Sequence, residues 1–268
     1  MKKIRTSKVL VFTMLVSILL MPYNVMASGT DSDVTIVIND DKPTNQDINI
    51  TVETSDDSSG IKEIILPNGE KVVKANTIYT VTENGSYIFK VSDNAGNETE
   101  GTVVIDNIDK KLPTLELTSD KTKPTNQDVV ITATASDTDS GIKEIILPDG
   151  SEVREESKTY IVSENGSYTF KAIDNAGNEV EKTIEVTNID KVPPVITVEP
   201  YETNWINQDI TVKVTVDKGK LNQDSYTFTE NGSFTFIAED EAGNITKETI
   251  TITNIDKVKP TIKIIVGE

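Results

Sequence analysis

The chain has 268 residues and carries 44 acidic against 26 basic side chains, a formal net charge of −18 that disfavours nucleic acid and anionic membranes as partners. It contains no histidine and no cysteine, which excludes Ser-His-Asp and Cys-His nucleophiles, disulfides, and zinc held by His or thiolate ligands. A carboxylate-pair glycosidase remains chemically open. Such enzymes usually have an aromatic-lined cleft, however, and the chain has one tryptophan. We therefore expect a protein that is not an enzyme.

Residues 1–27 have the features of a signal peptide. The positive charges come first, at Lys2, Lys3, Arg5 and Lys8. An apolar run, 9–21, follows and is too short to span a bilayer, and a small-residue stretch ends at Ala27. We predict cleavage after Ala27, which leaves 241 residues with 22 basic and 44 acidic side chains and no transmembrane segment. The alternative is an N-terminal anchor helix. We expect an exported protein, either secreted or associated with the cell surface or cell wall.

Three motifs recur along the rest of the chain. Asn-Gln-Asp recurs at positions 45, 126 and 207, with a spacing of 81 both times, and one further copy at 222 does not follow this spacing. Asn-Gly-Ser (84, 165, 231) and Asn-Ile-Asp-Lys (107, 188, 254) recur at spacings of 81 and then 66. Units of about 80 residues can each hold a small core, so the spacing predicts tandem domains. Their expected bounds are 28–110, 111–191 and a shortened 192–258, with 259–268 as the stub of a fourth domain in a truncated or longer array.

Each repeat shows the alternation of half-buried strands, beginning at Ile48, Val129 and Ile210, and none shows a helical period. The strands expected in repeat 1 are 34–38, 48–54, 61–66, 70–73, 78–82, 86–92 and 99–105. Gly, Asn, Asp and Pro separate them, as turns require. Seven short strands predict an all-β fold: tandem immunoglobulin-like β-sandwiches, three repeats in an extended array.

The sequence "ENGSYIF" (83–89) predicts a tyrosine corner before the sixth strand. In such a corner a Tyr hydroxyl bonds back to the backbone where the chain crosses between sheets. Tyr87 and Tyr168 match this pattern, whereas Phe234 in repeat 3 lacks the hydroxyl. The alternative is a tight Asn-Gly hairpin between neighbouring strands.

Repeat 3 departs from the other two copies. It has lost 15 residues between Asn-Gln-Asp and Asn-Gly-Ser, and "VDKGKLNQDSY" replaces the segment that contains "SGIKEIILPDG" in repeat 2. We expect its third strand to be shortened or absent. Trp205, near the start of this repeat, is expected to pack at a sheet edge rather than to form a sugar platform.

The chain resembles the bacterial Ig-like repeat domains of Gram-positive surface and secreted proteins. The resemblance is carried by "NQD", "SDDSSGIKEI" and "SDTDSGIKEI", "ENGSY", "DNAGN" and the linker "NIDKVPP", and covers nearly all of residues 30–258. It implies spacing and binding outside the cell: a stalk or adhesion segment without catalysis, whose partner is an unknown extracellular protein or glycan. Two alternatives stay open. One is a module that binds a glycan or host protein through loops at one end, and the other is the accessory domains of a truncated secreted hydrolase.

Four acidic residues are candidates for a calcium site where repeat 1 meets repeat 2. In an immunoglobulin-type sandwich the second-to-third and sixth-to-seventh strand loops lie at the end where the chain enters. This topology would bring together Asp109, Asp137, Asp139 and Asp174. Calcium takes oxygen ligands of this kind. The alternative is that each Asp only caps its own turn. In repeat 3, Lys218 aligns with Asp137, so a weaker response to calcium is expected there.

Overall fold

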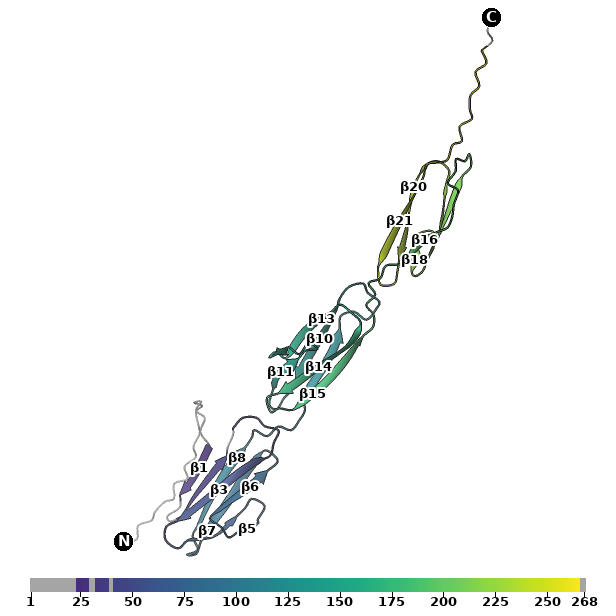
Figure 1. The fold of residues 1–268 in the computed structure, drawn as a ribbon. Coiled ribbons are helices and arrows are strands. Elements are labelled where there is room, and N and C mark those ends of the chain that lie inside the picture. The colour runs from purple at the N-terminus through teal and green to yellow at the C-terminus, as the bar shows by residue number, and fades with distance from the viewer. Residues whose placement is uncertain (1–22, 29–31, 39–40, 266–268) are drawn as a thin grey trace. The chain divides into compact units, whose positions relative to one another are not determined.

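The computed structural model describes residues 23–28, 32–38 and 41–265 (Figure 1). Regular secondary structure in these ranges is entirely β-strand, as predicted. No helix in them has the length and apolar character needed to cross a membrane. The chain divides into two compact units. Unit 1 comprises the residues up to Lys111 and the turn 175–177, and unit 2 comprises 112–174 and 178–268.

Unit 1 is a two-sheet β-sandwich. Its strands are β1 (Tyr23–Ser28), β2 (Ser32–Ile38), β3 (Ile48–Asp56), β4 (Ile61–Ile65), β5 (Lys71–Val72), β6 (Asn76–Val81), β7 (Gly85–Asp93) and β8 (Glu98–Ile105). The sheets have the orders β1-β2-β3-β6 and β5-β4-β7-β8. The alternating apolar residues meet in the core between the sheets, where Ile50, Ile64 and Phe89 are fully buried. All seven strands expected in repeat 1 are present, with ends shifted by at most two residues.

The fourth strand of the repeat, β5, joins the sheet of β4, because a tight turn directly after β4 brings the chain back alongside it. Leu66 N–H donates to the Glu70 carbonyl and Gly69 N–H to the Leu66 carbonyl, each at 2.8 Å. Gly69 has φ +84°, a conformation that glycine adopts without strain. Repeat 2 builds the same turn between Leu147 and Ser151. In the constant-type immunoglobulin sandwich the fourth strand pairs with the fifth instead, so repeats 1 and 2 differ from it at this strand.

The corner before the sixth strand is a tyrosine corner. The chain passes from β6 in one sheet to β7 in the other, and the Tyr87 hydroxyl donates to the Glu83 carbonyl at 2.6 Å. Tyr168 donates to the Glu164 carbonyl at 2.7 Å in repeat 2. The prediction is confirmed, and the hairpin alternative is wrong. Phe234 in repeat 3 instead stacks on Tyr226, with ring centroids 4.0 Å apart.

Unit 2 contains repeats 2 and 3. Repeat 2 consists of β9 (Thr114–Ser119), β10 (Val129–Ser136), β11 (Ile142–Ile146), β12 (Glu152–Val153), β13 (Ser157–Val162), β14 (Gly166–Asp174) and β15 (Glu179–Val186). Its sheets have the orders β13-β10-β9 and β12-β11-β14-β15, around a core that includes Phe170.

Repeat 3 is a smaller sandwich of six strands. They are β16 (Ile196–Val198), β17 (Ile210–Val216), β18 (Lys220–Leu221), β19 (Ser225–Phe228), β20 (Gly232–Glu239) and β21 (Ile245–Ile252). The sheets are β16-β17-β19 and β18-β20-β21, around a core that includes Phe236. The third strand is reduced to the two residues of β18, which confirms the predicted shortening.

The two ends of the described chain bear on the predicted domain bounds. Five of the six residues of β1 belong to the predicted signal peptide, whose residues 1–22 lie outside the described ranges. Cleavage after Ala27 would therefore remove β1 and leave β2 as the edge strand. Residues 259–265, the described part of the predicted fourth-domain stub, form no strand, and Ile262, Ile264 and Ile265 are exposed. Their apolar alternation has no strand partner there, and one unpaired strand is not stable alone.

Candidate functional site: linker and turn carboxylates

A side-chain clasp holds the segment that leaves each repeat. In repeat 1 the Asn84 Nδ2 donates to the Ile108 carbonyl at 2.8 Å, and the Ile108 N–H donates to Asn84 Oδ1 at 2.8 Å. The amide side chain thereby pairs with the backbone as a neighbouring strand would. The same two bonds join Asn165 to Ile189 and Asn231 to Ile255. The Asn-Gly-Ser motif therefore fixes the Asn-Ile-Asp-Lys motif, in addition to forming a turn.

The residue before the Asn-Gln-Asp copies at 45, 126 and 207 holds the same segment from its other side. Thr44 forms a parallel bridge with Ile108, since Thr44 N–H donates to the Asn107 carbonyl and Asp109 N–H to the Thr44 carbonyl, each at 2.9 Å. The corresponding bridges join Thr125 to Ile189 and Ile206 to Ile255. These bonds position the Asp that follows, which we call the linker Asp: Asp109, Asp190 and Asp256. Asp109 is buried, and its Oδ1 accepts the Lys111 N–H at 3.0 Å.

Two further carboxylates of repeat 2 lie at its turns. Asp137 follows β10, and its Oδ1 accepts the backbone N–H groups of Asp139, Ser140 and Gly141 at 3.1, 2.8 and 2.8 Å. Asp174 ends β14 and is fully buried, and its two oxygens accept the backbone and side-chain N–H groups of Asn178. Each carboxylate caps its own turn, as the simpler of the two interpretations predicted.

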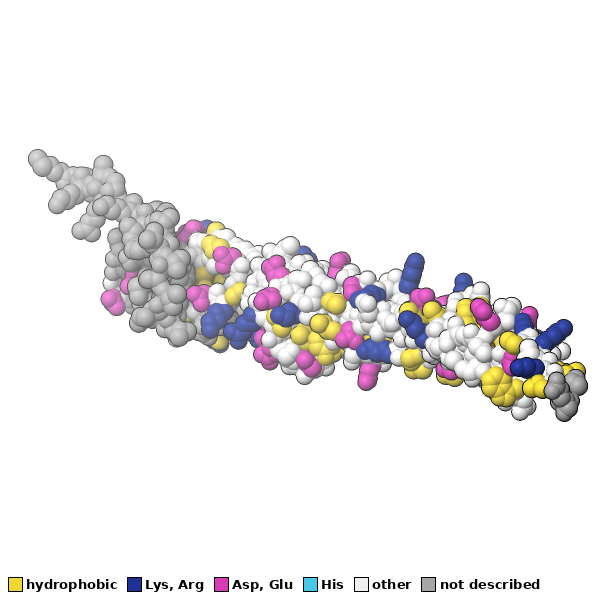
Figure 2. All heavy atoms as spheres, turned by 90° about the horizontal axis from the view of Figure 1, so that it is seen from above, with side chains coloured by type: hydrophobic (Ala, Val, Ile, Leu, Met, Phe, Trp, Pro, Cys, Tyr) yellow, Lys and Arg dark blue, Asp and Glu magenta, His cyan; other side chains and the backbone are white. Residues whose placement is uncertain are grey.

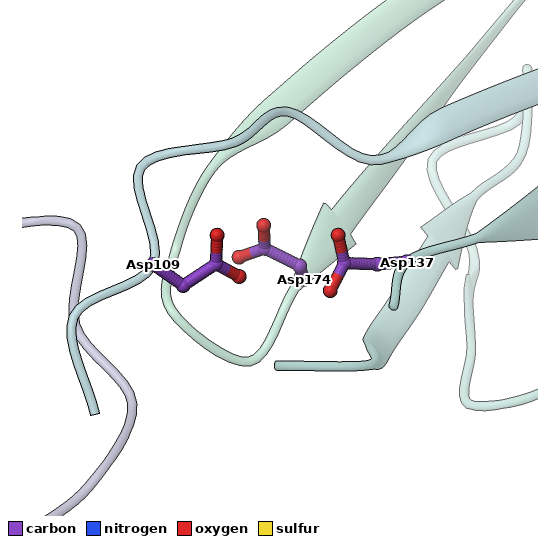
Figure 3. Close-up of side chains that lie close together, drawn as sticks. All are labelled: Asp109, Asp137 and Asp174. Atoms are coloured by element: carbon purple, nitrogen blue, oxygen red, sulfur yellow. The ribbon is translucent and has the colours of Figure 1, made fainter. Parts of the chain in front are cut away.

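Figure 3 shows the carboxylates of Asp109, Asp137 and Asp174 side by side. One oxygen from each lies within 4.8 Å of the other two. This is the one such group of three among the described residues. Like charges at this separation repel one another, and several carboxylate oxygens are the ligands that hard divalent cations take. The group could therefore bind a metal ion, in addition to capping the turns. Asp139, the fourth predicted ligand, is exposed and lies outside the group.

Repeat 3 has a lysine among the corresponding carboxylates. Lys218 Nζ lies 2.7 Å from Oδ2 of Asp190, the linker Asp, and 3.1 Å from Oδ2 of Asp240, the counterpart of Asp174. Asp240 Oδ1 also accepts the N–H groups of Ala242 and Asn244 at 3.0 and 2.8 Å. All of these residues belong to unit 2, so this ion-pair group joins the linker between its two repeats to the third one.

The pKa shifts of these groups have identifiable causes. Burial opposes the ionisation of Asp137, but the N–H groups of Gly141, Ser140 and Asp139 outweigh it and lower the pKa of that carboxyl. Burial likewise opposes the ionisation of Asp240, whereas its bonds from Asn244 and Lys218 lower its pKa to about 2. The hydrogen bond from Lys218 lowers the pKa of Asp190, and the same bond raises the pKa of Lys218.

The contact of the Asn-Gln-Asp motif with the Asp-x-Ala-Gly-Asn turn was missed from the sequence. In unit 2 the Asn126 N–H donates to the Ala242 carbonyl at 3.0 Å, and its Nδ2 donates to the Gly243 carbonyl at 2.9 Å. Asn244 Nδ2 donates in return to the Asp190 carbonyl at 2.8 Å. The sequence offered one signal of such a contact. The Asn-Gln-Asp motif recurs at 45, 126 and 207 with a constant spacing of 81 residues, and a motif that only formed a turn would not need this constant spacing.

Acidic and basic side chains are interspersed over the described residues on the face drawn in Figure 2, without a large field of one sign. Hydrophobic side chains lie there in small groups, as they do on ordinary soluble surfaces. Trp205 differs from expectation, because its exposed fraction is 75%. The prediction that it packs at a sheet edge is wrong: Tyr201, not Trp205, packs against the core of repeat 3.

Comparison with solved structures finds 20 similar chains, among them two of low similarity. One is described as "Structural insight into host cell surface retention of a 1.5-MDa bacterial ice-binding adhesin", with 15% identity, a TM-score of 0.41, and coverage of 79% of this chain and 91% of that one. The other is dimeric latent PorU from Porphyromonas gingivalis, with 10% identity, a TM-score of 0.23, and coverage of 79% and 27%. No family model and no curated protein matches the chain.

Proposed function

We propose that the protein is an exported, non-catalytic segment of a bacterial surface or secreted protein, which acts as a stalk or adhesion segment built from Ig-like repeats. The clasp on the outgoing linker, present in all three repeats, carries this proposal. A chain that uses its recurring motifs to hold the linkers between domains is suited to a role in which domain spacing matters. The predicted signal peptide in residues 1–27 and the lack of histidine and cysteine fit the same role.

The experiment separates spacing from recognition. Residues 28–268 are coated on beads and tested against arrays of glycans and extracellular matrix proteins, and are also inserted between a surface anchor and a reporter binding domain on cells. A stalk should raise the capture of large particles by the reporter, and should keep doing so when repeat 2 is replaced by a second copy of repeat 1. Capture that stays the same when repeats 2 and 3 are deleted from the insert would contradict the proposal.

The exposure of Trp205 favours a second candidate, a module that binds a glycan or host protein. An exposed aromatic ring offers a flat surface on which an apolar sugar face or side chain can stack. If this function holds, the arrays should reveal saturable binding that Trp205→Ala abolishes while the folding of repeat 3 is unchanged. Binding that survives Trp205→Ala would place recognition elsewhere, and the absence of binding would leave the stalk.

We further propose that the group of Asp109, Asp137 and Asp174 binds calcium. Two features of the group support this proposal: all of its ligand atoms are oxygens, and one oxygen from each residue lies within 4.8 Å of the other two. A third is Lys218, which supplies a positive charge at the corresponding place in repeat 3. Extracellular calcium modules bind with Kd of about 10⁻⁴–10⁻³ M. At about 1 mM calcium the tighter limit gives about 1.4 kcal/mol, enough to order a linker but little beside the stability of a domain.

Calorimetry on residues 28–268 tests this site. Wild-type protein should release or absorb heat at millimolar calcium with a stoichiometry of one, and Asp137→Ala should abolish the signal. Asp139→Ala is the matched control, since Asp139 lies outside the group and its loss should leave binding unchanged. Calcium should also clearly slow proteolysis near Asp109, whereas it should raise the melting temperature only slightly. If the wild type shows no heat of binding, the carboxylates only cap their turns.

A further inference from the structure

The ion-pair group of repeat 3 joins three separate parts of unit 2. Asp190 comes from the linker, Lys218 from the turn between β17 and β18, and Asp240 from the turn between β20 and β21. Asp190 Oδ1 is already used by the Val192 N–H, and Asp240 Oδ1 by the N–H groups of its own turn. Oδ2 of each carboxylate faces the ammonium group, and Oδ2 of Asp240 also accepts the Asn244 Nδ2 at 2.9 Å.

Sheet register shows that Lys218 and Asp137 occupy the same place in their repeats. Ala135 of β10 lies opposite Leu115 of β9, and Val216 of β17 lies opposite Ile196 of β16. Leu115 and Ile196 are counterparts 81 residues apart, and Asp137 and Lys218 each follow the paired strand residue by two. One position thus carries a carboxylate in repeat 2 and an ammonium group in repeat 3.

We propose that Lys218 is a built-in cation: its ammonium group bridges the linker and turn carboxylates as a metal ion would, so that repeat 3 is held on its linker without a divalent cation. This inference goes beyond the proposed function and uses residues of unit 2 alone. The pKa directions agree with it, since the pKa values of both carboxyls are lowered and that of the lysine is raised.

Neutral hydrogen bonds accompany the ion pair and make the lysine separable from folding. Asn126 still donates to the Ala242 and Gly243 carbonyls, and Asn244 to the Asp190 carbonyl, whatever residue stands at 218. Lys218 also lines an open cleft of about 670 Å³ together with Pro124 and Ile189, where water has access. Removal of its charge should therefore loosen repeat 3 on its linker without unfolding it, and salt should weaken the bridge.

The test measures the distance between repeats 2 and 3 with spin labels in residues 28–268. The chain has no cysteine, so Glu116→Cys on β9 and Glu248→Cys on β21, both exposed, provide two specific labels. The distance distribution should be narrow in the parent protein and equal in chelator and in 5 mM calcium, a concentration of about five times the looser extracellular Kd. Lys218→Met should broaden it in both conditions. Lys218→Asp should broaden it in chelator and narrow it again in calcium, because three carboxylates then surround the empty position.

Two controls keep the result specific. Lys257→Met removes a lysine whose ion pair with Asp209 lies within repeat 3, and should leave the distribution unchanged. Asp190→Asn combined with Lys218→Met should restore part of the lost order, since the repulsion that Lys218 screens is then removed. If Lys218→Met leaves the distribution narrow, the lysine does not hold repeat 3. If Lys218→Asp ignores calcium, the position does not act as a cation site, and the proposal is overturned.

Discussion

At the scale of single residues, the Tyr hydroxyl at the corner offers an internal comparison. Tyr168 donates to the Glu164 carbonyl at 2.7 Å, whereas Phe234 occupies the same place in repeat 3 without this bond. Tyr168→Phe should lower the free energy of unfolding of repeat 2 by about 1 kcal/mol, the net value of one such hydrogen bond. Urea unfolding followed by NMR amide peaks of repeat 2 measures it. Peaks of repeat 3 serve as the control. An unchanged urea midpoint for repeat 2 would show that the Tyr168 hydroxyl bond does not stabilise this repeat.

The low pKa of Asp240 predicts a pH dependence for repeat 3. Its folded pKa of about 2 lies below the ordinary value of 3.8, so the carboxylate stabilises the folded state at pH values above the ordinary one. This contribution should be lost as the pH falls from about 4 toward 2. Urea midpoints of repeat 3 amide peaks should therefore fall over this range. In Asp240→Asn the fall should be smaller, and an equal fall in both proteins would assign it to other carboxyl groups.

At the scale of elements, two glycines with the same backbone conformation are held differently. Gly150 (φ +82°) closes the turn between β11 and β12, and an added Cβ would have no neighbour within 4 Å. Gly219 (φ +83°) precedes β18, and a Cβ there would overlap the Glu239 carbonyl oxygen and lie 2.8 Å from Asp240 Cα. The turn at Gly219 therefore lies directly against the end of β20.

Alanine substitution should separate conformational cost from crowding at these glycines. Gly150→Ala should cost about 1 kcal/mol, because only the left-handed backbone opposes the side chain. Gly219→Ala should cost several times more, because β18 must also move away from β20. Thermal unfolding of the two variants beside the parent protein measures the difference. Equal melting temperatures for the two variants would show that repeat 3 has room to shift its turn.

The strands could be predicted from the sequence because apolar alternation and turn residues act locally. All seven strands of repeat 1 follow from these two signals, and the motif spacing identified the shortened strand of repeat 3. The sequence did not predict which sheet β5 joins, because this depends on the direction in which the Leu66–Glu70 turn returns the chain. The clasp of Asn84 on Ile108 was also missed, because turn formation alone is enough to account for an Asn before Gly. Of the four predicted ligands, Asp139 stands apart because the turn directs only Asp137 inward.

At the scale of the whole molecule, the linkers lead us to expect an extended protein. Each linker is short and contains proline, which restricts the backbone on both sides: "NIDKKLP" (107–113) and "NIDKVPP" (188–194). A compact globule of 241 residues would have a radius of gyration of about 18 Å. Solution scattering from residues 28–268 should give a clearly larger value. A radius close to the compact one would show that the repeats fold back on each other.

The asparagine clasp also governs how the protein ages covalently. An Asn followed by Gly converts to Asp or isoaspartate most readily, because the unhindered Gly nitrogen attacks the side-chain carbonyl carbon, ammonia leaves, and water then opens the resulting succinimide ring. Asn84, Asn165 and Asn231 all precede Gly, yet both polar atoms of each amide are held on the next linker, away from that attack. Asn68, also before Gly, has its amide oxygen engaged by the Glu70 N–H in an exposed turn. Deamidation in stored protein should therefore begin at Asn68, where repeat 2 already carries Asp149, and should reach Asn84, Asn165 and Asn231 last.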